Sequence, residues 1–141
     1  NANVKGYLFT VNNTDWTVVN NANWQYKFNC PAITKGVMDS GMVIVYWDAN
    51  NLPLPNTSNY VTPPFIGYQI ATRTITSSWQ LSPSGTGQVT VSIYDPTGVS
   101  IPAQGPLDFK VVVASAGNRM ANPNLNWNNY NEVKASLNIQ E

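Results

Sequence analysis

Alternation of apolar and polar residues predicts extended strands along most of this chain. The clearest run is 107–116, LDFKVVVASA, in which apolar residues take every second position while Asp108 and Lys110 begin the opposite face. Beyond Val111 that polar face ends. A strand that begins half-solvated and becomes apolar on both faces enters a sheet at its edge and continues into covered interior. We therefore expect the other strands to be arranged around 107–116.

Further alternating or apolar runs predict additional short strands. They lie at 5–11, 16–19, 24–30, 42–47, 65–71, 73–81 and 88–94. Turn-forming residues separate them, and Asp95-Pro-Thr-Gly98 has the composition of a type I turn. The segment 48–64 contains four prolines, which leaves at most an edge strand at Leu52 and Leu54. The predicted fold class is all-β, an antiparallel β-sandwich of about seven to nine strands.

Two segments break the alternation and predict one short internal helical turn and a short C-terminal helix. Thr34 can cap the internal turn, and Gly41 fits the left-handed position just past its end. Asn129 can cap the second helix, whose apolar residues recur at helical spacing. Those residues are Tyr130, Val133 and Leu137. We expect this stripe, with Trp127, to lie against an open end or edge of the sandwich.

The length of the chain favours one hydrophobic core. We predict a single domain over residues 1–141, with the sandwich in 1–117 and a loop and capping helix in 118–141. The sequence shows no signal peptide and no initiator Met. We therefore expect a mature or trimmed chain whose targeting segment lies upstream.

Charged residues make up 10% of the chain, and seven Lys and Arg balance seven Asp and Glu. Because no basic run could neutralise a row of phosphates, nucleic acid is not an expected partner. No apolar run has the length of a membrane span, so no membrane insertion by this domain is expected. The polar but charge-poor composition favours an extracellular setting. Cys30 is the single cysteine, and its alternation with apolar residues predicts a buried thiol.

Histidine is absent from the sequence, which removes Ser-His-Asp and Cys-His arrangements and the commonest zinc ligand. The carboxylates are scattered, without the spacing of a calcium loop. Two of them could still converge in space as in a glycosidase, so a two-carboxylate hydrolase stays as a remote alternative. We predict no catalytic residue, no metal and no cofactor, and a protein that is not an enzyme.

Aromatic side chains are the remaining resource for binding, because their flat apolar faces can stack on a ligand. Trp24, Trp47 and Trp79 alternate inward in their strands and are expected to fill the core. Aromatic residues near loops are candidates for an exposed binding face. These ligand-binding candidates are Trp16, Trp127, Tyr60 and Tyr68.

Several segments spread over nearly the whole chain resemble one family. They are Asn1–Val4, Tyr7–Val11 with Asp15-Trp16, Pro31–Thr34, Gly41–Tyr46, Phe109–Val113 and Asn129–Lys134. Together they resemble the C-terminal domain of uncharacterised Bacteroidetes cell-surface lipoproteins, which is often preceded by collagen-like Gly-x-y repeats. The resemblance implies an exported protein at the outer-membrane surface or outside the cell. Because collagen-like chains assemble as trimers, it also implies that a parent carrying such a stalk would form a homotrimer.

These observations predict a non-enzymatic cell-surface module, namely a structural, assembly or adhesive domain of an exported lipoprotein. The alternative is a carbohydrate-binding module that uses exposed aromatic residues. The expected partners are other copies of the chain, or an extracellular glycan or protein.

Overall fold

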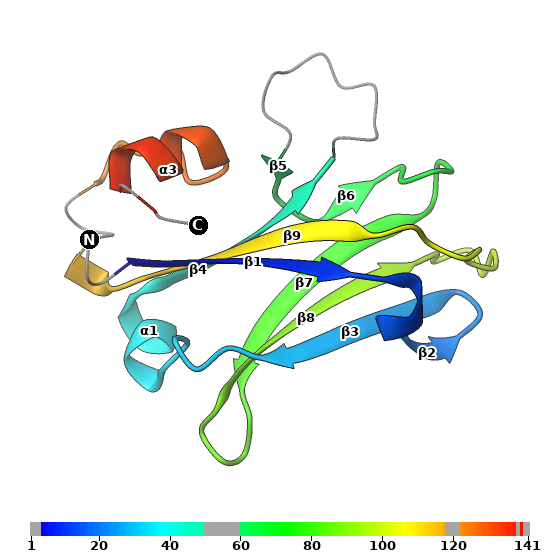
Figure 1. Ribbon diagram of the computed structural model, residues 1–141, viewed down its shortest axis with the longest axis horizontal. Coiled ribbons are helices and arrows are strands. Elements are labelled where there is room, and N and C mark those ends of the chain that lie inside the picture. Colours follow the sequence, from blue (N-terminus) through cyan, green and yellow to red (C-terminus); the bar gives the residue numbers. More distant parts are fainter. Residues whose placement is uncertain (1–3, 50–59, 118–121, 138, 140–141) are drawn as a thin grey trace.

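The computed structural model describes residues 4–49, 60–117, 122–137 and 139. Within these residues, nine strands form two antiparallel sheets that face each other (Figure 1). One sheet has the order β1-β9-β4-β5 and the other has the order β2-β3-β8-β7-β6. The antiparallel β-sandwich predicted from the alternation is confirmed. The expected edge strand at Leu52 and Leu54 lies outside the described residues.

Most elements follow the predicted runs, but the run at 65–71 forms a strand only at Phe65–Ile66, and the strand at Tyr60–Val61 was not predicted. The four-stranded sheet contains β1 (Val4–Val11), β9 (Leu107–Ala114), β4 (Met42–Asp48) and β5 (Tyr60–Val61). The five-stranded sheet contains β2 (Thr17–Asn20), β3 (Asn23–Asn29), β8 (Gly87–Tyr94), β7 (Thr74–Leu81) and β6 (Phe65–Ile66). The helical elements are η1 (Asn13–Asp15), α1 (Lys35–Ser40) and α3 (Tyr130–Leu137).

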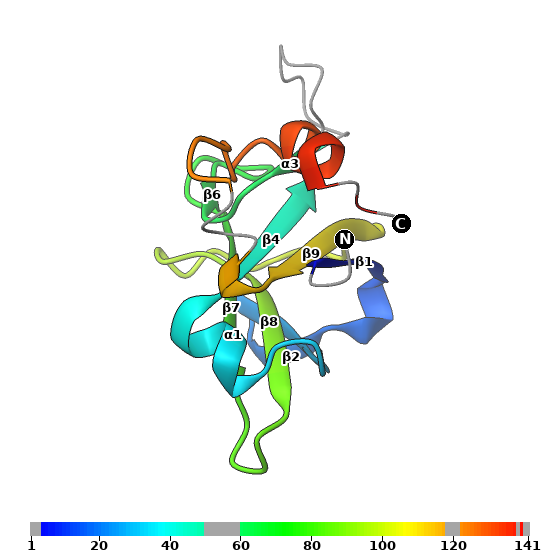
Figure 2. The same ribbon diagram turned by 90° about the vertical axis from the view of Figure 1, so that its left-hand side faces the viewer.

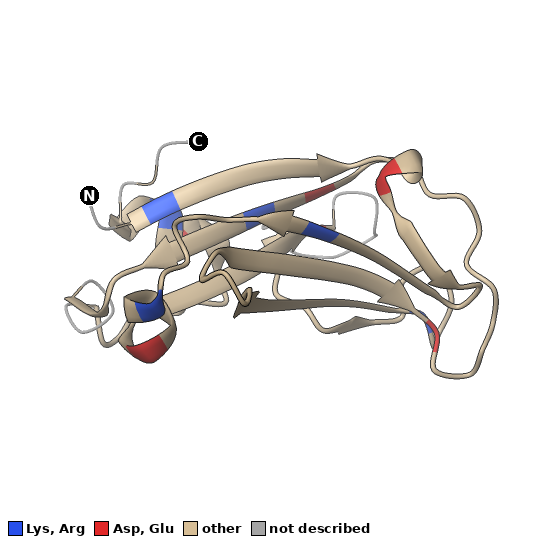
Figure 3. Cartoon of the chain, turned by 90° about the horizontal axis from the view of Figure 1, so that it is seen from below, with Lys and Arg blue, Asp and Glu red and all other residues tan. Residues whose placement is uncertain are grey.

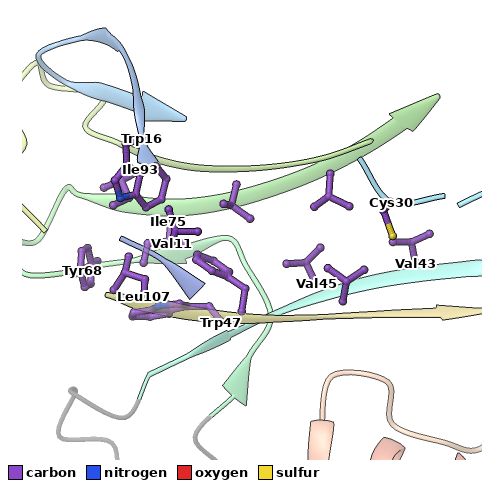
Figure 4. Close-up of a cluster of buried hydrophobic side chains, with 14 of the residues drawn as sticks. Val11, Trp16, Cys30, Val43, Val45, Trp47, Tyr68, Ile75, Ile93 and Leu107 are labelled. Carbon is purple, nitrogen blue, oxygen red and sulfur yellow. The ribbon is translucent and has the colours of Figure 1, made fainter. Parts of the chain in front are cut away.

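The inner core fills the space between the two sheets. Val89, Val91 and Ile93 alternate inward along β8 and are fully buried. Residues of β9 and β4 meet them from the opposite sheet, with Phe109 and Val111 fully buried as well. Figure 4 shows this cluster running the length of the sandwich, from the labelled Trp16 and Tyr68 at one end to Cys30 at the other. The predicted burial of the Cys30 thiol is confirmed, because the residue is 3% exposed.

A second core lies on the outer face of the four-stranded sheet, beneath α3 (Figures 1 and 2). Val133 and Leu137 of the helix pack there with Val112 of β9. Gly6 lets the chain after the helix approach β1, because a Cβ at this position would lie 2.5 Å from Cγ2 of Ile139. The helix stripe was predicted correctly, but its position was not. It covers a sheet face, where it shields side chains that a bare sandwich would expose, and not an open end or edge.

Burial by α3 also explains why the outer face of β9 is covered where the sequence pattern predicted contact with solvent. The strand lies between β1 and β4, and Lys110 is 6% exposed although alternation placed it on a solvated face. The prediction failed at Lys110 because the sequence pattern of one strand does not reveal a helix that packs on it later in the chain.

Helix α1 begins as predicted, since Thr34 Oγ1 accepts a hydrogen bond from Val37 N at 3.3 Å. Gly41 has a φ of −87°, so the predicted left-handed conformation is wrong. The residue is small for another reason, because a Cβ would come within 2.5 Å of the carbonyl oxygen of Ala114. The close approach brings the end of α1 against the last residue of β9.

Among the described residues, no helix is both long and apolar enough to cross a membrane.

Candidate functional site: an open groove beside Trp79

The four predicted ligand-binding residues do not share one surface. Trp16 and Tyr68 are each 7% exposed and belong to the inner core. Tyr60 and Trp127 are partly buried and pack against the second core beneath α3. The structure therefore divides the candidates between opposite faces of the four-stranded sheet, and it does not bring them together as an exposed stacking platform.

Tyr60 helps to enclose a buried lysine under α3. The Lys110 Nζ lies 4.6 Å from the centre of the Tyr60 ring and 4.4 Å from that of Tyr130. It also donates a hydrogen bond of 3.3 Å to the Tyr130 hydroxyl. Cation–π contacts strengthen when the cation is shielded from water, so this arrangement fastens the helix to the sheet.

Trp127 contributes its backbone to the same attachment, in addition to the side chain that packs against the second core. The hydroxyl of Tyr46 donates a 2.5 Å hydrogen bond to the carbonyl oxygen of Trp127. Tyr46 is fully buried, and its burial raises the pKa of the phenol well above the ordinary value. The hydroxyl therefore stays protonated and remains a donor.

Tyr68 closes one end of the inner core with Trp47 and Phe65. The Trp47 ring centre lies 5.3 Å from that of Tyr68 and 5.0 Å from that of Phe65. The Tyr68 hydroxyl donates a 2.7 Å hydrogen bond to Oε1 of Gln104, and burial raises the pKa of this phenol. These contacts are typical of a sealed core end.

The described carboxylates hold local structure in separate parts of the chain (Figure 3). Asp15 accepts a hydrogen bond from Asn12 N at 2.8 Å in the turn after β1. Asp39 pairs with Lys35 at 2.6 Å within α1. Other acidic contacts include those of Asp108 with Thr10, Glu132 with Asn126, and Asp95 with Thr72 and Thr97. Among the residues that the structure describes, no group of three or more Cys, Asp or Glu side chains could hold a metal ion.

The accessible aromatic residue of interest is one that alternation assigned to the core. The side chain of Trp79 lies on the same face of β7 as the fully buried Ile75, yet Trp79 is 37% exposed. It borders a hollow of about 300 Å³, which we call the Trp79 groove. The groove is lined by Val37, Met38, Gly41, Met42, Val43 and Trp79. The prediction that Trp79 fills the core is therefore wrong, although its inward direction is right.

The groove exists because the flanking strands are short. Strand β5 pairs with β4 at Trp47 and Asp48, and β6 pairs with β7 at Thr74 and Ile75. No described strand lies beside the rest of β4 or β7 on this side. The sandwich is thus closed at the Trp47 end and open at the Trp79 end.

Two consecutive prolines explain why both flanking strands stop. Continuing the observed registers would place Pro63 opposite Val45 in one sheet and opposite Ser77 in the other. Proline has no backbone N–H and cannot donate to a sheet ladder, so Pro63-Pro64 ends pairing on both sides. The prolines were visible in the sequence, and they are the signal that could have predicted an exposed Trp79.

A second hollow, of about 320 Å³, lies beside α3. Its lining residues are Asn122, Pro123, Asn124, Leu125, Glu132 and Ser136. Glu132 is the one ionisable residue of this set, so the lining offers no acid–base pair. The Trp79 groove, with its exposed indole, is the stronger candidate for binding.

Comparisons with protein-family models, with curated proteins and with solved structures gave no significant match to this chain. The resemblance to Bacteroidetes surface lipoproteins therefore stays a prediction from the sequence motifs.

Proposed function

We propose that this chain is a non-enzymatic binding module of an exported protein, with a structural, assembly or adhesive role outside the cell. The observation that carries the proposal is the Trp79 groove. Its indole and the half-exposed Met38 present apolar surface within a hollow of the sandwich. Exposed apolar surface in a hollow is typical of a place where another molecule binds.

The arrangement of the described carboxylates supports a role in binding over a role in hydrolysis. Five of the described carboxylates lie in turns, α1, β9 and α3, where each has a hydrogen-bond partner within the chain. A two-carboxylate hydrolase needs two acids held about 5 to 10 Å apart across one substrate site. No observation favours that alternative.

The proposals about where the module is located and how it assembles are based on the sequence alone. The low charge content and the family resemblance support export to the outer-membrane surface or the medium. If the parent protein carries a collagen-like stalk, three copies of the module would be held together. Light scattering on the full-length parent would then report a trimer.

Carbohydrate binding is the second candidate function, and the exposed face of Trp79 favours it, because aromatic rings are flat apolar platforms. Polar side chains are needed to orient a sugar, yet the six residues that line the groove offer no polar side-chain atom besides the indole nitrogen. We therefore rank a protein ligand ahead of a glycan.

The proposal can be tested by immobilising the wild-type chain and the Trp79→Ser variant and passing panels of extended peptides and of glycans over both. We expect the wild-type chain to retain members of at least one panel and the variant to lose them, while circular dichroism shows the same fold. Equal behaviour of the two proteins toward both panels would contradict a binding role for this groove.

A further inference from the structure

The edge of β7 next to the Trp79 groove has the form of an unfilled strand position. β6 pairs only with the first residues of β7, and no described strand lies beside Thr76–Leu81 on the outer side. An unpaired edge presents a row of backbone donors and acceptors to any other extended chain. Pro63-Pro64 prevents β6 from extending along the rest of β7.

The direction of the backbone groups follows from the neighbouring hydrogen bonds. The carbonyl oxygen of Arg73 accepts from Gly67 N at 2.9 Å, on the side of β7 where β6 lies. Backbone groups of successive strand residues point to alternate sides, so every second residue after Arg73 points to the same edge. Ser77, Trp79 and Leu81 therefore direct their N–H and C=O groups toward the open position.

The surroundings define the chemistry of an incoming chain. β7 carries no charged residue, and neither do the residues that line the groove. Every second side chain of the added strand would face the groove, where it would meet Val43 and the indole of Trp79. Met38 and Met42 also line the groove, and methionine adapts its shape to different apolar partners. The matching ligand is uncharged and has apolar residues at alternate positions.

We propose that the β7 edge and the Trp79 groove together accept an extended segment of another polypeptide, which adds a strand to the five-stranded sheet. This inference deepens the proposed binding function and rests on it. Main-chain hydrogen bonds to Ser77, Trp79 and Leu81 would supply affinity, and the groove would select apolar side chains at alternate positions. An extended protein segment fits better than a glycan, because the polar groups at this edge are backbone groups at strand spacing.

The test uses the complete chain and the capped peptide acetyl-Thr-Val-Thr-Val-Thr-Val-amide. Calorimetry measures its affinity, and hydrogen exchange followed by NMR reports on individual amides. We expect saturable binding and slower exchange at the amides of Ser77, Trp79 and Leu81. Ser77→Pro removes one outward-facing N–H and should weaken binding about tenfold, the effect of losing one hydrogen bond. Ser78→Ala, at a residue whose backbone points toward β8, is the matched control and should bind as the wild type does.

A second probe keeps the test independent of whether Ser77→Pro folds. The same peptide, methylated at the backbone nitrogens that would face β7, retains its side chains but cannot form the ladder. Undiminished binding of this peptide, or binding without protection of the three amides, would overturn strand addition. Binding of glycans alone at Trp79 would overturn it too while leaving the proposed function intact. Retention of neither ligand class would remove both proposals.

Discussion

Trp47 of the four-stranded sheet and Trp79 of the five-stranded sheet lie toward opposite ends of the sandwich, and their environments differ. Both side chains point between the sheets, yet Trp47 is 2% exposed and Trp79 is 37% exposed. Phe65 of β6 lies against Trp47, whereas no described strand continues that cover as far as Trp79. Alternation along a strand sets the direction of a side chain, and the flanking strands decide whether it is buried.

Truncating Trp47 should lower the free energy of unfolding more than any other substitution considered below. Trp47→Ala removes a fully buried indole that contacts Phe65 and Tyr68, and we expect it to lower the free energy of unfolding by about 3 to 5 kcal/mol. Urea denaturation followed by circular dichroism measures the change. A loss no greater than that of Trp79→Ala would contradict the difference between the closed and open ends.

Tyr68→Phe tests the hydrogen bond between Tyr68 and Gln104 at the closed end of the core. The substitution removes the hydroxyl that donates to Gln104, a residue that is itself 4% exposed. We expect a loss of about 1 to 2 kcal/mol, because a buried acceptor loses its donor. Denaturation curves of the two proteins measure it, and an unchanged midpoint would show that the hydroxyl contributes nothing to the seal.

Trp79→Ala should cost less stability although it removes the same side chain. The indole is already in contact with solvent, so we expect a loss of about 1 kcal/mol, a fraction of the value for a fully buried aromatic. Acrylamide should also quench a larger fraction of the tryptophan fluorescence in the wild type than in the variant, because Trp79 is the most exposed of the five tryptophans. If all the fluorescence of the wild type were protected, the groove would not be open in solution.

The smallest change in stability should come from a substitution at Asp95, which lies just after β8. Hydrogen bonds from Thr97 and Thr72 lower the pKa of this carboxyl. A lowered folded-state pKa stabilises the fold above the unfolded value of about 3.9, and the contribution is lost as pH falls through the folded-state pKa. Asp95→Asn should therefore melt below the wild type at neutral pH, and the difference should disappear in acid. Thermal melts across this range measure it, and a difference independent of pH would contradict the assignment.

The strands could be predicted from the sequence because their signal is local. The alternating residues of β8 and the apolar run of β4 specify which faces are covered without reference to distant segments. The position of α3 could not be predicted in this way. Its stripe is visible at Tyr130, Val133 and Leu137, but the surface that receives it is assembled from β1, β9 and β4, far away in the chain.

The candidate site was missed for the same reason. Proximity to a loop predicts exposure for Trp16 and Tyr68, yet both residues are buried. Loops can fold back over a core end, as the segment after β6 does with Tyr68, whereas a residue in the middle of a regular strand can remain exposed when its neighbour strand is short. Pro63-Pro64 ends strand pairing at both adjoining edges, and this non-local effect leaves Trp79 exposed.

The lysine enclosed between Tyr60 and Tyr130 has a consequence for how α3 finds its place. An apolar stripe on a smooth apolar sheet could slide by one helical turn and still bury a similar area, because dispersion and burial are not directional. The ammonium group of Lys110 restricts that freedom, since a shifted helix would move the Tyr130 ring and hydroxyl away from a desolvated cation. We expect Lys110→Met to retain a folded sandwich with a less uniquely aligned helix, so the charge acts together with the Tyr46–Trp127 hydrogen bond to favour one docked state.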